Sequence, residues 1–402
     1  MKRGLALVAL IGLSVSVARA QSSVTLFGVL DAGFGYQNNV GTLGSKAAGK
    51  SNVQMITGVA MGSRFGLTGT EDLGGGTKTI FTLESGFSLP TGNVQYTNAL
   101  FGRQSFVGLS NKAYGTVTVG RQYTPYYSML APYGPTWYLT GYAGAHPGDV
   151  DSLDTLYRNN NSIEYMSPTI GGFTFGGSYA LGGVAGSVNQ GSTLSAAMTY
   201  LNGPVVLAAG FLRINNSAEG GGAWGANSTA INASEQGVSA INYGYRNAQA
   251  QQRVALEGDW RFTPQWEVTV SLSNTQYIPG INSGFRSEAI FNTAGGVLHW
   301  KPTTTWDFAA GYAYMQATKA NGVTDPAHYN QFNLSEFYAL SKRTSVYAVQ
   351  GYQHASGQTY TLSASGVGSI VNAVASVGDG MNSTPSSNQN QVVLGVGFLS
   401  RF

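Results

Sequence analysis

The residues that most often perform chemistry in proteins are scarce in this 402-residue chain and stand apart from one another. There is no cysteine, which excludes disulfides, thiolate metal sites and a cysteine nucleophile. The histidines occur singly, at His146, His299, His328 and His354. A serine hydrolase would need one of them beside a serine and an acid, and isolated histidines are more often hydrogen-bonded bystanders. We therefore predict that the chain is not an enzyme, and that it has no metal site and no cofactor.

The glycine-rich runs do not form a nucleotide-binding motif. Gly74–Gly76 and Gly220–Gly222 precede no lysine–serine pair and open no helical pattern. A phosphate-binding loop requires both features. We interpret these runs as turns.

Only 10% of the residues are charged, against about a quarter in an ordinary soluble domain. Met1–Arg3 is basic, Gly4–Val17 is largely apolar, and Ala18–Ala20 has the A-x-A pattern of a cleavage site. This order is typical of a secretory signal, whereas a membrane anchor would need about 20 apolar residues. Removal of residues 1–20 leaves 18 basic and 18 acidic residues. A neutral mature chain gives no reason to expect a nucleic-acid partner.

Short alternating segments must position the remaining charges, because no later apolar run is long enough for a transmembrane helix. In residues 253–262 two sets alternate: Val254, Leu256, Trp260 and Phe262 against Arg253, Glu257, Asp259 and Arg261. A period of two places these sets on opposite faces of a strand. Lipid on one side and water on the other would explain the pattern, since lipid-facing charges cost about 2–4 kcal/mol near the bilayer midplane. Residues 306–314 and 392–402 have the same phase.

The connections separate a membrane barrel from a soluble β-sandwich, which the strands alone do not. Tight turns at 71–76, 110–115 and 167–172 alternate with long loops near 122–157, 214–250 and 355–388. Aromatic residues also gather towards the strand ends, as interfacial girdles require. Counting the segments gives about sixteen strands. Residues 21–402 are thus predicted to form an all-β transmembrane antiparallel β-barrel, closed by its first and last strands, in a Gram-negative outer membrane.

Several segments closely resemble the trimeric porins of beta-proteobacterial outer membranes. The internal ones are Ser63–Thr77, Phe81–Phe87, Gly102–Leu109 and Gly115–Arg121, and the terminal ones are Ser23–Gly33 and Gly397–Phe402. The resemblance implies a sixteen-stranded trimeric barrel whose third loop, at about 122–157, folds inward and narrows the pore. It also implies passive diffusion of small hydrophilic solutes and ions.

Three arginines precede apolar residues expected on the lipid side, so their side chains should point into the lumen. They are Arg64, Arg103 and Arg158. In the resemblance these positions match a basic ladder that faces the constriction loop, and Arg121, which opens the loop, is a weaker member. The arginines could instead pair with a nearby acid such as Glu84 or Glu164. A row of arginines opposite acids would create a transverse field that orients dipolar solutes.

The predicted constriction loop is rich in aromatic residues, among them Tyr123 and Tyr127, and has no acid before Asp149, Asp151 and Asp154. Because the acids come so late in the loop, we predict a weak anion preference. We expect these aspartates to be exposed turn residues, with weak divalent-cation ligation as the alternative. The aromatic side chains could instead make the channel selective for sugars or aromatic acids.

The expected partners follow from this location. They are outer-membrane lipid including lipopolysaccharide, other copies of the chain in a homotrimer, and small solutes. Phe402 resembles the signal read by the barrel assembly machinery, although any final lipid-facing strand would end on an apolar residue. If the chain is a trimer, residues 27–34 should supply part of the contact. Loops 214–250 and 355–388 leave a surface adhesin or receptor role open.

One strand does not fit the two-faced pattern. In residues 332–340, the register that places Leu334, Tyr338 and Leu340 outward also places Glu336 outward and Phe337 inward. Either the strand contains a β-bulge, or Glu336 lies near an interface where it reaches water.

Overall fold

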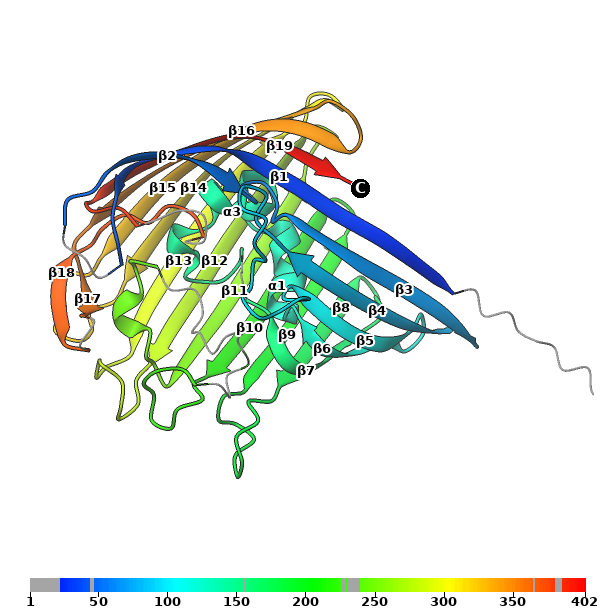
Figure 1. The fold of residues 1–402 in the computed structure, drawn as a ribbon, viewed down its shortest axis with the longest axis horizontal. Coiled ribbons are helices and arrows are strands. Elements are labelled where there is room, and N and C mark those ends of the chain that lie inside the picture. The colour runs from blue at the N-terminus through cyan, green and yellow to red at the C-terminus, as the bar shows by residue number, and fades with distance from the viewer. Residues whose placement is uncertain are drawn as a thin grey trace, which may run out of the picture.

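The computed structural model describes residues 22–43, 47–154, 157–225, 229, 239–363, 366–379 and 385–402. The predicted signal segment, residues 1–20, lies outside the described residues. Within them, one antiparallel sheet of seventeen strands closes into a barrel (Figure 1). The all-β transmembrane barrel predicted from the alternating segments is therefore confirmed.

The barrel strands, in chain order, are β1 (Ser23–Val40), β2 (Lys50–Thr57), β3 (Arg64–Gly74), β4 (Thr77–Gly86), β5 (Gln104–Asn111), β6 (Gly115–Gln122), β7 (Asn159–Met166), β8 (Phe173–Ala180), β9 (Thr193–Asn202), β10 (Val205–Asn215), β11 (Ala250–Arg261), β12 (Trp266–Ile278), β13 (Ala289–Trp300), β14 (Trp306–Ala317), β15 (His328–Ala339), β16 (Thr344–Ser356) and β19 (Asn390–Arg401). A separate hairpin, β17 (Gln358–Leu362) and β18 (Gly368–Asn372), lies in the last long loop.

The first and last strands close the barrel, as predicted. β1 pairs with β19 from Val29↔Arg401 to Gln37↔Val393, which leaves no open sheet edge. β2 pairs with the second half of β1, from Ala32 to Val40. β3 pairs with the first part of β1, from Ser23 to Val29. β2 and β3 are two halves of one barrel strand, interrupted by residues 58–63, which we name the wall bulge. The seventeen strands therefore make a sixteen-stranded barrel.

The outer face of β11 is apolar and its inner face is charged, as the sequence pattern predicts. Val254, Leu256 and Trp260 are 41%, 51% and 52% exposed on the outside. Arg253 and Glu257 point inward and are buried. The same alternation runs around the barrel, so large apolar side chains cover its outer surface. A bilayer is the solvent that such a surface fits.

Glu336 lies on the outer face, and β15 contains no bulge at this point. The pairing of β15 with both neighbours runs unbroken through the residue. Leu334 and Tyr338, on either side of it, are exposed. The Gln350 side chain donates a hydrogen bond of 3.0 Å to Glu336 Oε2. Gln350 therefore gives one carboxylate oxygen of Glu336 a hydrogen-bond partner, and the strand pairing remains continuous.

Short and long connections alternate along the whole chain. The connections at the end where β1 begins are short: 75–76, 112–114, 167–172, 203–204, 262–265, 301–305 and 340–343. Those at the other end are longer: 41–49, 87–103, 123–158, 181–192, 216–249, 279–288, 318–327 and 357–389. This asymmetry is the one expected of an outer-membrane barrel.

The loop 123–158, named the constriction loop below, folds into the barrel. It contains the short helices α1 (Pro125–Leu130), α2 (Thr136–Leu139) and α3 (Gly141–Gly144), which lie within the cylinder in Figure 1. Pro125, Pro132 and Pro135 each lack an N–H group, so these three positions cannot donate to a strand ladder. α1 begins after Thr124, whose side-chain oxygen accepts a bond from the Tyr127 N–H. In the described part of the chain, no helix is long and apolar enough to cross a membrane.

Candidate pore constriction

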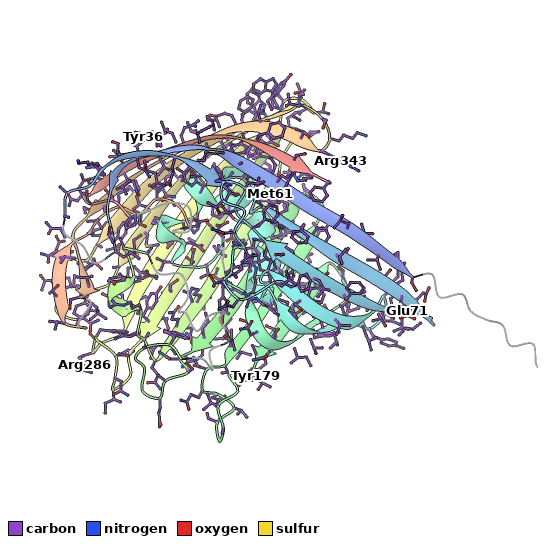
Figure 2. All side chains as sticks on the ribbon, in the orientation of Figure 1. Tyr36, Met61, Glu71, Tyr179, Arg286 and Arg343 are labelled. Carbon is purple, nitrogen blue, oxygen red and sulfur yellow. The ribbon has the colours of Figure 1, made fainter. Side chains whose placement is uncertain are left out.

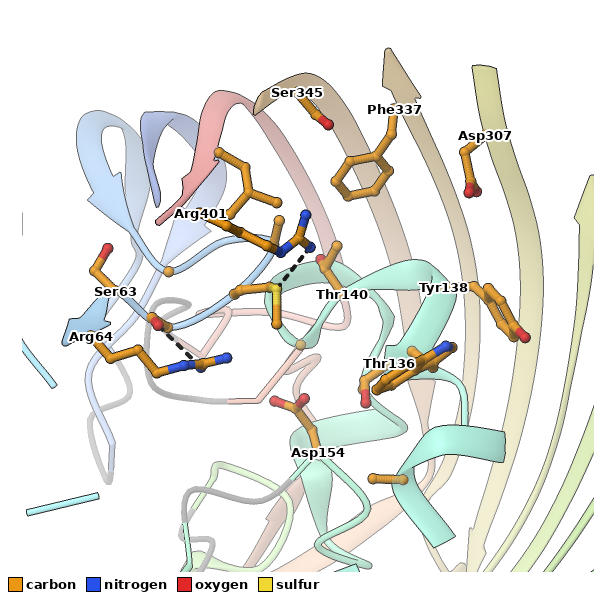
Figure 3. A pocket seen from close by; sticks show the side chains of 18 of the residues that line it. Ser63, Arg64, Thr136, Tyr138, Thr140, Asp154, Asp307, Phe337, Ser345 and Arg401 are labelled. Carbon is orange, nitrogen blue, oxygen red and sulfur yellow. Dashed lines mark hydrogen bonds between the residues drawn. The ribbon is translucent and has the colours of Figure 1, made fainter. Parts of the chain in front are cut away.

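A cavity of about 1130 Å³ occupies the barrel interior beside the constriction loop. The wall bulge, the 87–103 loop and the constriction loop border one part of it. The ends of β11 to β16 nearest the short turns, the end of β19 and Asp379 border the rest. Figure 3 shows Arg64 and Asp154 pointing into this space. Of the site residues predicted from the sequence, the cavity is lined by Arg64, Arg103, Arg158, Tyr123, Tyr127 and Asp154.

Glu84 ties two of the arginines to the barrel wall. Arg103 Nε donates to Glu84 Oε1 at 2.5 Å, and Arg64 Nε lies 3.5 Å from the same oxygen. The carboxylate is buried in the wall and does not border the cavity. The side chain of Arg64 is 18% exposed and that of Arg103 7%. One negative charge thus sits behind two positive charges, and Arg64 is the more accessible of the two.

Two tyrosines hold the third arginine. The hydroxyl of Tyr96 accepts a bond of 2.8 Å from Arg158 Nη1, and the Arg158 guanidinium lies 4.3 Å from the centre of the Tyr123 ring. The hydroxyl of Tyr123 accepts bonds from both Arg158 Nη2 and Arg103 Nη2, the latter at 3.0 Å. Tyr127 stacks on Tyr123 at 4.7 Å. Tyr123 therefore joins the arginines into one rigid group.

Sequence reasoning missed Tyr96, because it lies in the 87–103 loop within no repeated pattern. Its role emerges only when that loop and the constriction loop meet. No signal in the sequence alone would have singled it out.

Arg121 and Glu164 lie outside the cavity. Arg121 donates to the backbone oxygens of Gly102 and Arg158 at 2.8 and 3.0 Å, and to Asn160 Oδ1 at 2.7 Å. The Arg121 side chain therefore fixes the base of the constriction loop and does not face the cavity. Glu164 points inward from β7, but it forms no ion pair among the described residues, so the suggested arginine–Glu164 pairing is wrong. The acid that pairs is Glu84.

The expected exposure of Asp149, Asp151 and Asp154 is wrong. Asp149 and Asp151 are 3% and 0% exposed, and Asp154 is half-buried. The loop turns back against the barrel wall here, and Asp149 Oδ1 accepts a bond of 3.0 Å from the Asp154 N–H. Burial, together with the nearby Asp154 charge, raises the pKa of Asp149. Burial and the Asp379 carboxylate raise the pKa of Asp154.

His146 forms a hydrogen-bonded chain that has the residue types of a serine-hydrolase triad. Its Nδ1 lies 2.6 Å from Asp151 Oδ2, and its Nε2 lies 2.9 Å from Ser271 Oγ. Burial would raise the pKa of Asp151, but the His146 charge and the bonds from His146 and Ser273 lower it. All these groups are buried away from the cavity, with no room for a substrate. These hydrogen bonds anchor the constriction loop to β12.

A second cluster of charges lies on the far wall, and sequence reasoning missed it as a group. His299 Nε2 lies 2.8 Å from Asp307 Oδ1, and its Nδ1 lies 3.4 Å from Glu267 Oε2. The ring of Tyr138, from α2, stacks on His299 at 4.2 Å. His299 is a hydrogen-bonded group, as expected of an isolated histidine. Strand register brings these three side chains together. His299 pairs directly with Glu267 on β12. On β14 it pairs with Ala309, so Asp307 lies diagonally opposite it.

A closed barrel with an apolar outer surface, an inward-folded loop and a charged interior cavity defines a membrane channel. A family model described as Gram-negative porin matches residues 6–358, so the chain belongs to the Gram-negative porin family. It is 29% identical to an outer membrane porin protein of Bordetella pertussis, over 88% of this chain and 94% of that one. It is 37% identical to outer membrane porin protein 32 of Delftia acidovorans, over 55% of this chain and 62% of that one.

Solved structures show the same fold. The anion-selective porin from Comamonas acidovorans matches with a TM-score of 0.66 and 23% identity, over 95% of this chain and all of that one. OmpT of Vibrio cholerae, solved as a trimer, matches with a TM-score of 0.61 and 13% identity, over 95% and 99% of the two chains. The protein is an outer-membrane diffusion channel of a Gram-negative bacterium, in a family of channels and not of enzymes.

Proposed function

We propose that this channel passes small hydrophilic solutes and ions with a weak preference for anions. The observation that supports it is the grouping of Arg64, Arg103 and Arg158 beside the cavity, where one buried carboxylate, Glu84, forms ion pairs with both Arg64 and Arg103. These arginines are largely buried, so they act on a passing ion mainly through the potential in the pore rather than by direct contact.

The acids of the constriction loop oppose this potential only weakly. The pKa of Asp154 is raised by burial and by the Asp379 charge, which favours the neutral carboxyl group. Asp149, behind it, has a raised pKa for similar reasons. Beside the constriction loop, the three arginines therefore outnumber Glu84 and the charged Asp379. The likeness to a porin described as anion-selective is consistent with this preference.

The test is a reversal-potential measurement on the purified protein in planar bilayers under a KCl gradient. The proposal expects stepwise ohmic conductance and a reversal potential of the sign that marks chloride as the more permeant ion. A reversal potential that marks potassium as the more permeant ion would contradict the anion preference and leave the channel function intact.

A second candidate is selectivity for sugars or aromatic acids, and one observation favours it. Trp137, from α2, lines the cavity and is 62% exposed, near Tyr127 and Tyr138 in the same lining. Exposed aromatic faces stack on sugar rings and planar solutes. Current block by millimolar sugars or benzoate, lost in Trp137→Ala, would support selectivity. Equal conductance with and without these solutes would count against it.

Assembly into a homotrimer is part of the same proposal, with residues 27–34 in the subunit contact. The outer face of β1 offers Phe34, which is 59% exposed. We also propose that outer-membrane lipid, including lipopolysaccharide, surrounds the remaining outer face, whose apolar coat fits it. A crosslinking ladder ending at a trimer in detergent would support the assembly.

Phe402 is proposed as the signal for the barrel assembly machinery. Its backbone exchanges bonds of 3.0 and 3.1 Å with Gly28, and its ring lies over that glycine, which has no side chain to obstruct it. This contact also gives the residue a role in closing the barrel. Deletion of Phe402 should lower the yield of inserted protein, and full yield would contradict the proposal.

A further inference from the structure

The second barrel strand is broken halfway by the wall bulge, residues 58–63. On β1, Ala32 pairs with Thr57. Three residues earlier, Val29 pairs with Arg64. Two residues of β1 therefore face six residues of the other strand, whereas an ordinary β-bulge adds a single residue. The surplus backbone must leave the plane of the wall.

The wall bulge leaves the wall on the water side. Its backbone groups lie outside the strand ladder, and in hydrocarbon each such group left without a partner would cost several kcal/mol. Gly58, Ala60, Met61 and Gly62 all line the cavity, and Figure 2 labels Met61 within the outline of the barrel. Val59 is fully buried, in a cluster that also contains Tyr142 of the constriction loop. The bulge thus extends from the wall towards that loop.

One carboxylate holds the wall bulge in place. The N–H groups of Ala60 and Met61 each donate to Asp31 Oδ2 at 2.7 Å. The hydroxyl of Tyr347, from β16, donates to Asp31 Oδ1 at 2.6 Å. Ser63 Oγ donates to the Asp31 backbone oxygen at 2.9 Å. Asp31 is fully buried, so these bonds are shielded from water and fix the geometry of the bulge.

The wall bulge also touches the basic residues of the pore. Arg64 Nη1 donates to the Gly62 backbone oxygen at 3.2 Å, and Arg401 Nη2 lies 3.1 Å from Met61 Sδ (Figure 3). A β-carbon on Gly62 would lie 2.9 Å from Arg103 Nη1, so a side chain at residue 62 would require this guanidinium to shift. The position of the bulge therefore determines where these arginines lie.

We propose that the wall bulge is a second constricting element of the pore, facing the constriction loop, and that Asp31 and Tyr347 are the positioning residues that hold it. It limits the size of the solutes that pass and sets the places of Arg64 and Arg103. The size limit depends only on the channel function, whereas the effect on selectivity rests on the proposed anion preference.

The first experiment removes the bulge. Deletion of residues 59–62 leaves two residues opposite two and preserves the inward and outward phase of β2 and β3. Single-channel conductance should rise about 1.5-fold or more, and larger poly(ethylene glycols) should enter the pore, because the narrowest section widens. The control deletes residues 184–187 from the 181–192 loop, which does not border the cavity. A folded 59–62 deletion with unchanged conductance and exclusion size would overturn the proposal.

The second experiment keeps the chain length and exploits the absence of cysteine. Met61→Cys gives the protein a single thiol in the bulge. A charged methanethiosulfonate reagent should then reduce the single-channel current. The control is Ile281→Cys, which is 83% exposed outside the cavity and should react without a change in current. If the Met61→Cys protein conducts and the reagent leaves its current unchanged, Met61 does not line the conducting path.

The third experiment tests the positioning of the arginines. Gly62→Ala should displace the Arg103 guanidinium and lower the anion preference. Asp31→Asn leaves one acceptor oxygen where the carboxylate has two, so it cannot accept from both the bulge N–H groups and the Tyr347 hydroxyl, and it should change both conductance and reversal potential. Tyr347→Phe removes one bond and should give a smaller change of the same kind. Unchanged reversal potentials in all three variants would refute the positioning role.

The outcomes for this inference and for the proposed function differ. If the wild-type channel prefers cations but the Met61→Cys current is blocked, the anion preference fails and the second constriction stands. If the wild-type channel prefers anions, the thiol reagent does not change the Met61→Cys current and the 59–62 deletion does not change conductance, then the second constriction fails and the anion preference stands.

Discussion

The two charged walls of the pore arrange their charges differently. Beside β3 to β7, Arg64 and Arg103 share one buried acid, Glu84. Across the cavity, the bases have acids of their own. Arg261 lies 3.0 Å from Glu267, and Lys301 lies 3.0 Å from Asp307.

This difference teaches which wall sets the potential of the pore. On the far wall each positive charge lies about 3 Å from a negative one, so the potential of the pair is weak at larger distances. The Arg261 side chain is 60% exposed, so water and salt screen the remaining potential. The arginines near β3 have little access to water and an excess of positive charge. We expect them to decide the sign of the selectivity.

The largest expected effect comes from removing one charge on each wall in turn. Arg103→Ala should lower the anion-to-cation permeability ratio about fivefold or more, because a unit charge a few Å from an ion in water is worth roughly 1 kcal/mol and about 1.4 kcal/mol corresponds to a factor of ten. Arg261→Ala removes the same charge from the screened wall and should change the ratio much less. Reversal potentials of the two variants in a KCl gradient measure this. Equal shifts would show that both walls contribute alike.

A smaller effect should follow pH. Burial and the Asp379 charge raise the pKa of Asp154, so its carboxyl group is neutral below that pKa and ionises as the pH rises through it. The new negative charge opposes the arginines, which stay protonated, and the anion preference should fall. Asp149, with its own raised pKa, should add to the change. The measurement is the reversal potential as a function of pH.

Asp154→Asn is the matched control for the pH effect. It cannot ionise at residue 154, so it should lose much of the fall in anion preference while keeping the conductance of the wild type. A pH dependence identical to that of the wild type would show that other groups cause it.

The smallest expected effect concerns the link between the arginines. Tyr123→Phe keeps the ring beneath Arg158 and removes the oxygen that accepts from Arg103 and Arg158. The anion preference should fall by less than about twofold, because the charges remain and only their order changes. Tyr127→Phe, which keeps its stacking partner, is the control and should behave as wild type. An unchanged Tyr123→Phe channel would mean that the ring alone positions Arg158.

Much of the fold could be predicted from the sequence because a barrel wall is periodic. The side chains of β11 alternate in sequence as they do in space, and this pattern places Glu257 inside and Leu256 outside without any tertiary information. The wall bulge escaped prediction because Gly58–Ser63 interrupts that periodicity, and nothing in the segment itself tells inward from outward. Asp31, its anchor, is distant in sequence and looks like any other inward polar residue.

The site was less predictable than the wall. Arg64 and Arg103 follow from strand phase, but their partner Glu84 was only one of two candidates until register placed it. The aspartates of the constriction loop were expected at the surface because acids in loops usually are, whereas the loop returns to the wall and buries Asp149 and Asp151. His146 finds Ser271 and Asp151 only because that loop reaches β12.

The seam between Gly28 and Phe402 has a consequence for biogenesis. Since Phe402 and β19 complete the hydrogen bonding of β1, the cylinder cannot seal until the chain has been synthesised through residue 402 and this segment has crossed the inner membrane. Any truncated product would reach the periplasm with one edge of its sheet unsatisfied, ready to aggregate or be degraded.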